Sequence, residues 1–154
     1  MDRRSLREIP VIVKFSNDTE VNQVPALLDL LFELGFDGVN FGNTSIDYIQ
    51  RRKLIDPSER KLFDYFTKTF TGGVSGRPLK ETSLELGSRS VEYTKAGPPT
   101  QEFHTIRTGG IETWQDIQDS ERAGISLNQW YTCYFENFAN HAHKIYEQFF
   151  ENSR

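Results

Sequence analysis

Short apolar runs alternate with helical segments four times along this chain, and this alternation constrains the fold more than any other feature. The first run, residues 10–15, is almost continuously β-branched, which is typical of a strand buried on both faces of a parallel sheet. Three further runs follow at residues 38–41, 103–106 and 125–130. Between them, apolar residues recur at spacings of three and four. The pattern predicts parallel strands joined by right-handed crossovers.

A helix is expected after each strand. The first begins near residues 22–24, because Pro25 is tolerated only in a first turn, and it ends at Gly35. The others are predicted over about residues 80–95, from Trp114 to Gly124, and along Phe135, Phe138, Ala142, Ile145 and Phe149. Four such units are half of a (β/α)8 barrel, which needs about 250 residues. The 154 residues therefore predict an α/β fold, the parallel (β/α)4 half of a TIM-type barrel, as a single domain over residues 1–154.

Residues 46–70 do not fit the alternation and predict a helical insert. Asp56 to Glu59 contains a cap residue, a proline and a glutamate in capping-box order, which predicts that a helix opens there. The apolar face of this helix is expected to pack into the core; its members are Leu62, Phe63, Phe66 and Phe70.

Composition and charge exclude several classes of function. The net charge is −4 without a long basic run, so no nucleic-acid surface is expected. Cys133 is the single cysteine, and His104, His141 and His143 lack the spacing of metal ligands, so neither a disulfide nor a metal site is predicted. Because no apolar run reaches about 18 residues and the first residues lack a signal core, we expect a cytoplasmic protein or one peripheral to a membrane, with no transmembrane or signal segment.

Two strand-to-helix turns carry residues suited to a phosphate. Gly109 and Gly110 follow the third strand, and Tyr131 and Thr132 follow the fourth. Glycines let the backbone approach a ligand closely, and the helix that follows adds partial positive charge. Paired turns of this kind bind phosphate after strands 7 and 8 of many barrels. The alternative is a tight turn without a ligand.

Other polar residues are expected at the same edge of the sheet. Lys14 ends the first strand and either neutralises a flavin ring or anionic substrate, or is simply solvated. Asn43 and Thr44 suit a planar ring with alternating N–H and C=O groups, although both are ordinary turn residues. The glycine-rich loop that includes Gly76 either lies along a flat ring or serves as a flexible linker.

Together these segments resemble dihydroorotate dehydrogenase in order and spacing over about residues 10–135, except for residues 46–70. The loop Gly-Gly-x-Ser-Gly-x-Pro-Leu at residues 72–79 and the Gln-x-Tyr-Thr sequence at residues 129–132 look like the quinone-dependent, FMN-containing class. The resemblance implies the C-terminal half of that barrel. It also implies FMN-dependent oxidation of (S)-dihydroorotate to orotate with a quinone acceptor, in de novo pyrimidine biosynthesis.

The resemblance also implies roles for individual residues. Asn43 and Thr44 would bind the pyrimidine ring of dihydroorotate or orotate, and Lys14 would contact the flavin ring. No catalytic residue is implied within this chain, because the family's serine base precedes the strand of Lys14 and is expected upstream. The other residues implied to bind FMN are Gly42, Gly76, Gly109, Gly110, Tyr131 and Thr132, the last four at its phosphate.

The chain departs from the family at several positions. Gly42 stands where the family usually has threonine, and Arg107 and Thr108 stand where it often has Gly-Val. Arg107 is expected either to meet the flavin or to substitute for a missing charge. Because a half barrel exposes two edge strands, we expect self-association or pairing with an N-terminal half-barrel. The alternative function is a non-catalytic FMN- or phosphate-binding half-barrel, or a truncated fragment that is inactive alone.

Overall fold

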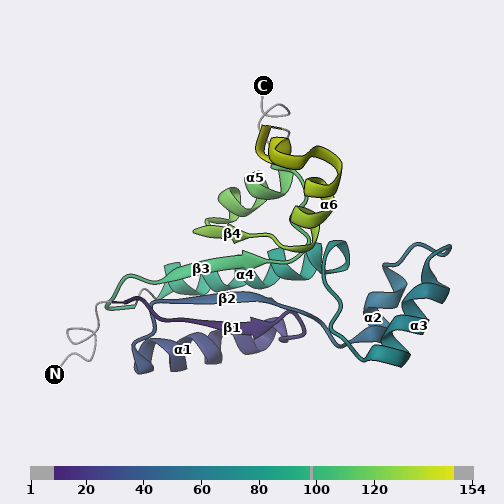
Figure 1. Cartoon of the computed structure of the whole chain (residues 1–154). Helices are drawn as coiled ribbons and strands as arrows, with labels where there is room; N and C mark the ends of the chain where they lie inside the picture. Colours follow the sequence, from purple (N-terminus) through teal and green to yellow (C-terminus); the bar gives the residue numbers. More distant parts are fainter. Residues whose placement is uncertain (1–8, 98, 148–154) are drawn as a thin grey trace.

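The computed structural model describes residues 9–97 and 99–147, and within them four parallel strands form one sheet in the order β1-β2-β3-β4 (Figure 1). Within this part of the chain the sheet stays open, with β1 and β4 at its edges. The predicted α/β half-barrel is therefore confirmed. The strands are β1 (Ile12–Ser16), β2 (Gly38–Asn43), β3 (His104–Thr108) and β4 (Leu127–Gln129).

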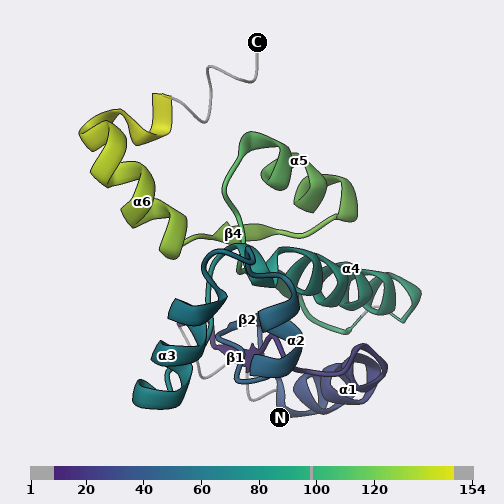
Figure 2. The ribbon, with the colours of Figure 1, turned by 90° about the vertical axis from the view of Figure 1, so that its right-hand side faces the viewer.

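Three helices lie along one face of the sheet (Figure 2). The first begins one residue before Pro25 and ends at Gly35, which adopts φ 71° as a left-handed cap, so both predicted signals are confirmed. A proline in the first turn loses no intrahelical hydrogen bond, and glycine adopts a positive φ without strain. The three helices are α1 (Val24–Leu34), which follows the short 3-10 turn η2 (Val21–Gln23), α4 (Lys80–Ala96) and α5 (Trp114–Ala123).

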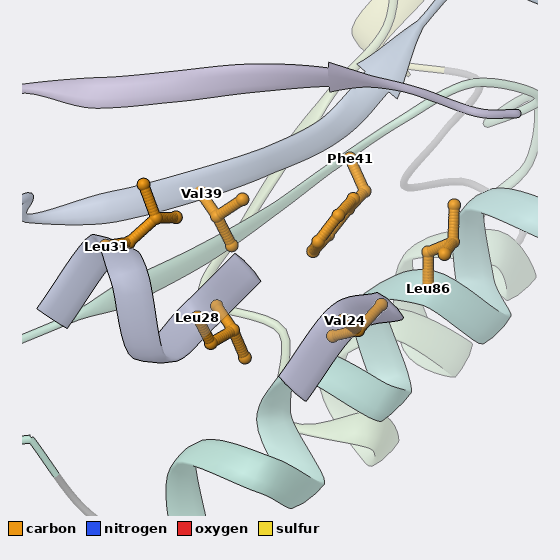
Figure 3. Close-up of a cluster of buried hydrophobic side chains, with 6 residues drawn as sticks. All are labelled: Val24, Leu28, Leu31, Val39, Phe41 and Leu86. Carbon is orange, nitrogen blue, oxygen red and sulfur yellow. The ribbon is translucent and has the colours of Figure 1, made fainter. Parts of the chain in front are cut away.

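The core lies between β2 and the helices α1 and α4 (Figure 3). Val39 and Phe41 project from β2 into this layer and are fully buried. Removing each such side chain from water contributes about 1.5–3 kcal/mol. The packing therefore fixes β2, and with it the polar residues that follow its carboxyl end. The other members of the core cluster are Val24, Leu28, Leu31 and Leu86.

The prediction that the first strand is buried on both faces is wrong. Val13 and Phe15 pack against the core cluster, but Ile12 is 41% exposed and Lys14 is exposed as well. These residues alternate along β1, so one face of the strand meets the helices and the other faces the concave side of the open sheet. Within the described residues, no layer covers that concave side at β1.

The insert is helical, as predicted, and consists of α2 (Tyr48–Lys53) and α3 (Arg60–Phe70). The predicted capping box is wrong, because α3 begins only at Arg60 and Asp56 instead accepts a hydrogen bond from the Ser58 amide in a preceding turn. The expected core packing is also wrong. The pair projects away from the sheet (Figure 1), so the apolar face of α3 stays open. Leu62, Phe66 and Phe70 are each more than half exposed.

The last helix, α6 (Thr132–His141), is shorter than predicted. Ala142 adopts a φ of 48° and begins the 3-10 turn η4 (Ala142–Lys144), so Ala142 and Ile145 do not continue the helical stripe. Phe135 and Phe138 are 55% and 41% exposed rather than buried in a core. The predicted member Phe149 lies outside the described residues.

Candidate functional site: a pocket at the carboxyl ends of the strands

A pocket opens where the strands end, lined by residues of the first three strands and of the segments that follow β2, β3 and β4. Its volume is about 130 Å³. Pockets that hold a whole cofactor-sized ligand usually measure roughly 300–1,000 Å³. This pocket therefore encloses only part of such a ligand. All nine residues predicted from the sequence line it: Lys14, Gly42, Asn43, Thr44, Gly76, Gly109, Gly110, Tyr131 and Thr132.

The Gly109-Gly110 turn requires glycine at both positions. Gly109 adopts φ 124° and Gly110 adopts φ 69°, which side chains disfavour. A Cβ on Gly110 would lie 2.5 Å from the Cα of Lys80, at the start of α4. The backbone of the turn is thus packed directly against the neighbouring helix.

A capping box starts α5 immediately after this turn. The Thr113 hydroxyl accepts from the Asp116 amide at 3.3 Å, and the Asp116 carboxylate accepts from the Thr113 amide at 2.9 Å. The same carboxylate accepts from the Glu112 amide at 3.0 Å. Sequence reasoning missed this box, although Thr-x-x-Asp is the usual Thr-x-x-Glu signature with aspartate in place of glutamate.

The second turn meets the glycine-rich loop at the start of α6. The cap residue Tyr131 makes no side-chain hydrogen bond to the first turn of the helix. The Thr132 hydroxyl donates to Ser75 Oγ at 3.0 Å. A Cβ on Gly76, whose φ is 78°, would lie 3.2 Å from Thr132 Cγ2. The loop therefore packs against the amino terminus of α6, where backbone N–H groups and the helix dipole favour an anion.

A polar network crosses the concave face and joins all four strands. Gln129 Oε1 lies 3.5 Å from Lys14 Nζ and 3.3 Å from Asn40 Nδ2. The Thr108 hydroxyl donates to Asn40 Oδ1 at 3.0 Å. Sequence reasoning gave no role to Asn40, Thr108 or Gln129. Their position on one face could have been recognised, because residues that pair in register on neighbouring parallel strands project to the same face of the sheet.

The turn after β2 presents exposed side chains on a fixed backbone. The Asn43 carbonyl accepts from Asn17 Nδ2 at 2.8 Å, and the Thr44 carbonyl accepts from Ser16 Oγ at 3.0 Å. The side chains of Asn43 and Thr44 are both exposed. A Cβ on Gly73 would lie 2.0 Å from Thr44 Oγ1, so the glycine-rich loop closes over this turn.

A buried arginine anchors the insert beside the pocket. Arg51 on α2 is 7% exposed and pairs with Asp18, with its Nη2 3.3 Å from Oδ1. Burial acts to raise the pKa of Asp18, but hydrogen bonds from Ser45, the Ile46 amide and Arg51 outweigh it and lower that pKa below its ordinary value. The insert is therefore tied at its base, while its apolar face projects outward.

The rim of the pocket carries paired charges and a buried thiol. Glu112 lies between Arg77 and Lys80, with N···O distances of 3.0 and 3.4 Å. Cys133 donates to the Glu112 carboxylate at 3.2 Å. Burial, together with this carboxylate, raises the pKa of the Cys133 thiol to about 12. A neutral thiol is a poor nucleophile, so Cys133 has no activation of the kind that a catalytic cysteine needs.

Arg107 does not line the pocket, and the expectation that it meets a flavin ring there is wrong. Its side chain is 1% exposed and extends from β3 toward α4 and α5. Alternation along the strand is the reason, because Thr108 faces the concave side and its neighbour must face the helices.

Within the described residues, no group of three or more His, Cys, Asp or Glu side chains lies close enough to hold a metal ion. In the same residues, every helix is too short or too polar to cross a membrane.

A family model described as dihydroorotate dehydrogenase matches residues 2–152. The chain is 34% identical to the dihydroorotate dehydrogenase (quinone) of Pseudarthrobacter chlorophenolicus, over 86% of this chain and 34% of the relative. It is 35% identical to that of Kineococcus radiotolerans, over 86% and 33%. A solved structure of a ligand-free DHODH from Eimeria tenella matches with a TM-score of 0.65 and 28% identity, over 89% of this chain and 32% of that one. The chain spans about a third of the length of these curated relatives. On this evidence, the chain belongs to the dihydroorotate dehydrogenase family.

Proposed function

We propose that this chain forms the C-terminal half of a dihydroorotate dehydrogenase, where it holds the phosphate of FMN and part of the substrate site. The convergence of nine residues from separate strands and loops on one pocket carries the proposal. The complete protein would oxidise (S)-dihydroorotate to orotate for pyrimidine biosynthesis. Its acceptor would be a quinone, as the relatives' name states for them.

The phosphate end of the pocket fits an anion. The backbone at Gly109 and Gly110 is positioned where any side chain would collide with α4 or require an unfavourable φ. The amino terminus of α6 adds backbone N–H groups. The side chain of the cap residue Tyr131 forms no hydrogen bond with them. A phosphate monoester would accept hydrogen bonds from such amides and be stabilised by the helix dipole. The Thr132 hydroxyl would become a further donor by turning away from Ser75, to which it donates in this structure.

The opposite end of the pocket fits the ring system. Lys14 is held toward the concave face by Gln129, which Asn40 also contacts. Its ammonium group would stabilise negative charge on the flavin ring, and FMN, when bound, supplies the hydride-accepting chemistry. Asn43 and Thr44 would orient the pyrimidine ring, since their amide and hydroxyl groups match its alternating N–H and C=O groups.

The proton-accepting base would come from outside this pocket. Cys133 keeps its proton because its pKa is raised to about 12, and Lys14 is cationic in the proposed role. The edges of β1 and β4 have no further strand beside them among the described residues, and unpaired edges are costly. We propose that an N-terminal half-barrel, or a second copy of the chain, covers them and that the N-terminal half supplies the base.

The proposal is tested by titrating FMN into the purified chain, alone and together with the matching N-terminal half of a relative. We expect the chain, or the reconstituted pair, to become yellow and to release flavin on denaturation. Sizing at micromolar concentration should show self-association or a heterodimer. Failure of both preparations to bind FMN would overturn the proposal.

A second candidate function is a non-catalytic half-barrel that binds FMN or phosphate. The open sheet and the small enclosed volume favour this candidate for the chain alone. Anaerobic addition of dihydroorotate separates the two. Bleaching of bound FMN in the reconstituted pair indicates the enzyme, and flavin that stays oxidised in both preparations indicates the binding module.

A further inference from the structure

Arg107 is a buried cation that forms no direct ion pair with a described carboxylate, although Asp116, Asp119 and Glu81 are near enough to act on its charge. Its side chain is 1% exposed, and within residues 9–97 and 99–147 no carboxylate lies at ion-pair distance from its guanidinium. All of its hydrogen bonds go to neutral acceptors: Ser83 Oγ at 3.0 Å, Lys80 O at 3.0 Å, Asp116 O at 3.1 Å and Ser120 Oγ at 2.9 Å. Buried charges are ordinarily paired, so this arrangement calls for an explanation.

Hydrogen bonds on one side of the guanidinium connect Arg107 to the Gly109-Gly110 turn. Ser83 accepts a hydrogen bond from Arg107 and lies 2.7 Å from the Gly109 carbonyl, to which its hydroxyl donates. Arg107 also binds the carbonyl of Lys80, whose backbone is packed against Gly110. Both glycines are therefore held through residues that Arg107 itself contacts.

Hydrogen bonds on the other side of the guanidinium connect Arg107 to α5. Arg107 Nη1 binds the Asp116 carbonyl and the Ser120 hydroxyl. The carboxylate of Asp116 accepts the amides of Glu112 and Thr113, which follow the turn. A single guanidinium thus joins β3 to the helices on both sides of the phosphate turn.

The charge of Arg107 remains available to an anion at the turn. The Asp116 carboxylate, whose charge acts most strongly on Arg107, lies 3.2 Å from Lys80 Nζ, so a second cation that also pairs with Glu112 partly offsets it. An arginine stays protonated in proteins, even when buried. A bound phosphate would therefore offset the buried charge of Arg107, which has no direct counter-ion among the described residues.

We propose that Arg107 is a positioning residue for the phosphate turn, which it holds through Ser83 and Lys80 while supplying buried positive charge to the bound phosphate. The identity of the ligand as FMN rests on the proposed function. The distinctive expectation is that Arg107 matters for the phosphate group and not for the flavin ring.

The test compares FMN with riboflavin, which lacks the phosphate, in the same preparation that binds FMN. Arg107→Met should weaken FMN binding by roughly tenfold to a hundredfold, because a charge and its hydrogen bonds are lost, and should change riboflavin binding by less than about twofold. Arg107→Lys keeps the charge and should lie between. Arg89→Met removes an arginine of α4 whose side chain is 43% exposed, and it is the matched control.

Three outcomes overturn the proposal: equal losses for FMN and riboflavin in Arg107→Met, no loss for either, or a control that behaves like Arg107→Met. If Arg107→Met does not fold, Arg107→Lys and Ser83→Ala take its place. Ser83→Ala removes the link to Gly109 but keeps the charge, and it should also weaken FMN selectively.

A second measurement separates this proposal from the proposed function. If the natural chain binds neither flavin, the proposed function fails, but amide hydrogen exchange still tests Arg107. Faster exchange at residues 109–113 in Arg107→Lys or Ser83→Ala, with unchanged exchange in the α1 core, supports the positioning role. Unchanged exchange at residues 109–113 overturns it.

Discussion

Gly42 and Thr108 share one volume: a Cβ at Gly42 would lie 2.1 Å from the Cβ of Thr108 and 2.6 Å from Asn40 Oδ1. The Thr108 hydroxyl uses that volume to donate to Asn40 across the strands. Gly42 and Thr108 therefore form the floor of the pocket together. It also explains how β2 accommodates glycine at a position where a side chain is expected from the family resemblance.

This relationship predicts strong coupling between the two positions. Gly42→Ala should lower the free energy of unfolding by about 1–3 kcal/mol, because the methyl group overpacks the site. Thr108→Gly should also destabilise, through its lost hydroxyl and its flexible backbone. The double variant should lose less than the sum by roughly 0.5–3 kcal/mol, since each change relieves the other. Urea unfolding of the four proteins measures the coupling, and strict additivity would contradict the shared volume.

Gly110→Ala should be among the most damaging single-methyl changes in the chain. The residue has a φ of 69°, and its Cβ would lie 2.5 Å from Lys80 Cα, so backbone strain adds to a collision with backbone atoms. We expect a loss of about 2–4 kcal/mol in the free energy of unfolding. Gly97→Ala is the control, because nothing lies within 4 Å of its Cβ position and its φ is −135°. Equal melting temperatures for the two variants would contradict the packed turn.

The capping carboxylate of Asp116 should make stability depend on pH in the acid range. Burial acts to raise the pKa of Asp116, but hydrogen bonds from Glu112, Thr113 and Lys80 outweigh it and leave that pKa below its ordinary value. The folded state therefore binds its proton less readily than the unfolded state, so the stabilisation is present above about pH 4 and is lost as the pH falls through the folded-state pKa.

Asp116→Asn should accordingly destabilise the protein by about 1 kcal/mol at pH 7, because the amide removes the charge on which Lys80 and the first-turn amides depend. The difference from the natural protein should shrink when unfolding is measured toward pH 3. Asp119→Asn alters an exposed pair with Arg122 on the same helix and should change stability by less than about 0.5 kcal/mol. A difference for Asp116→Asn that stays constant between pH 7 and pH 3 would exclude the linkage.

The thiol of Cys133 should be unreactive in the folded protein. Its pKa is raised to about 12 by burial and by Glu112, so almost no thiolate forms at pH 8. Because the folded pKa lies above the unfolded one, the neutral thiol favours folding below about pH 8.5, and this contribution is lost as the pH rises toward 12. Iodoacetamide should label the chain quickly only after denaturation. Cys133 is the single cysteine, so labelling is unambiguous, and rapid labelling of the folded chain would contradict the raised pKa.

The bounds of α1 and the residues of the pocket could be predicted, because their sequence signals are local or periodic. Gly35 and Pro25 mark the bounds of α1 through backbone geometry that depends on each residue alone. Gly109, Gly110 and Thr132 come within four residues of the ends of predicted strands, and parallel strands bring their carboxyl ends to one edge of the sheet. Their meeting in one pocket therefore follows from the alternation of strands and helices.

The remaining features depend on partners that are distant in sequence. Phe66 and Phe70 have the spacing of a core face, yet they are exposed because the insert projects from the sheet. The position of Arg107 two residues before Gly109 suggested either a contact with the flavin or a substitute for a missing charge, but its side chain faces Ser83 and Ser120 on α4 and α5.

The sequence by itself determined the order of strands and helices and the turn chemistry at the pocket, because helical periodicity and glycine conformation act over a few residues. Only the tertiary structure decided which face each strand residue takes and which helical faces find a covering layer. Burial depends on packing between elements that are dozens of residues apart, as between Gly42 and Thr108, and no local pattern encodes that contact.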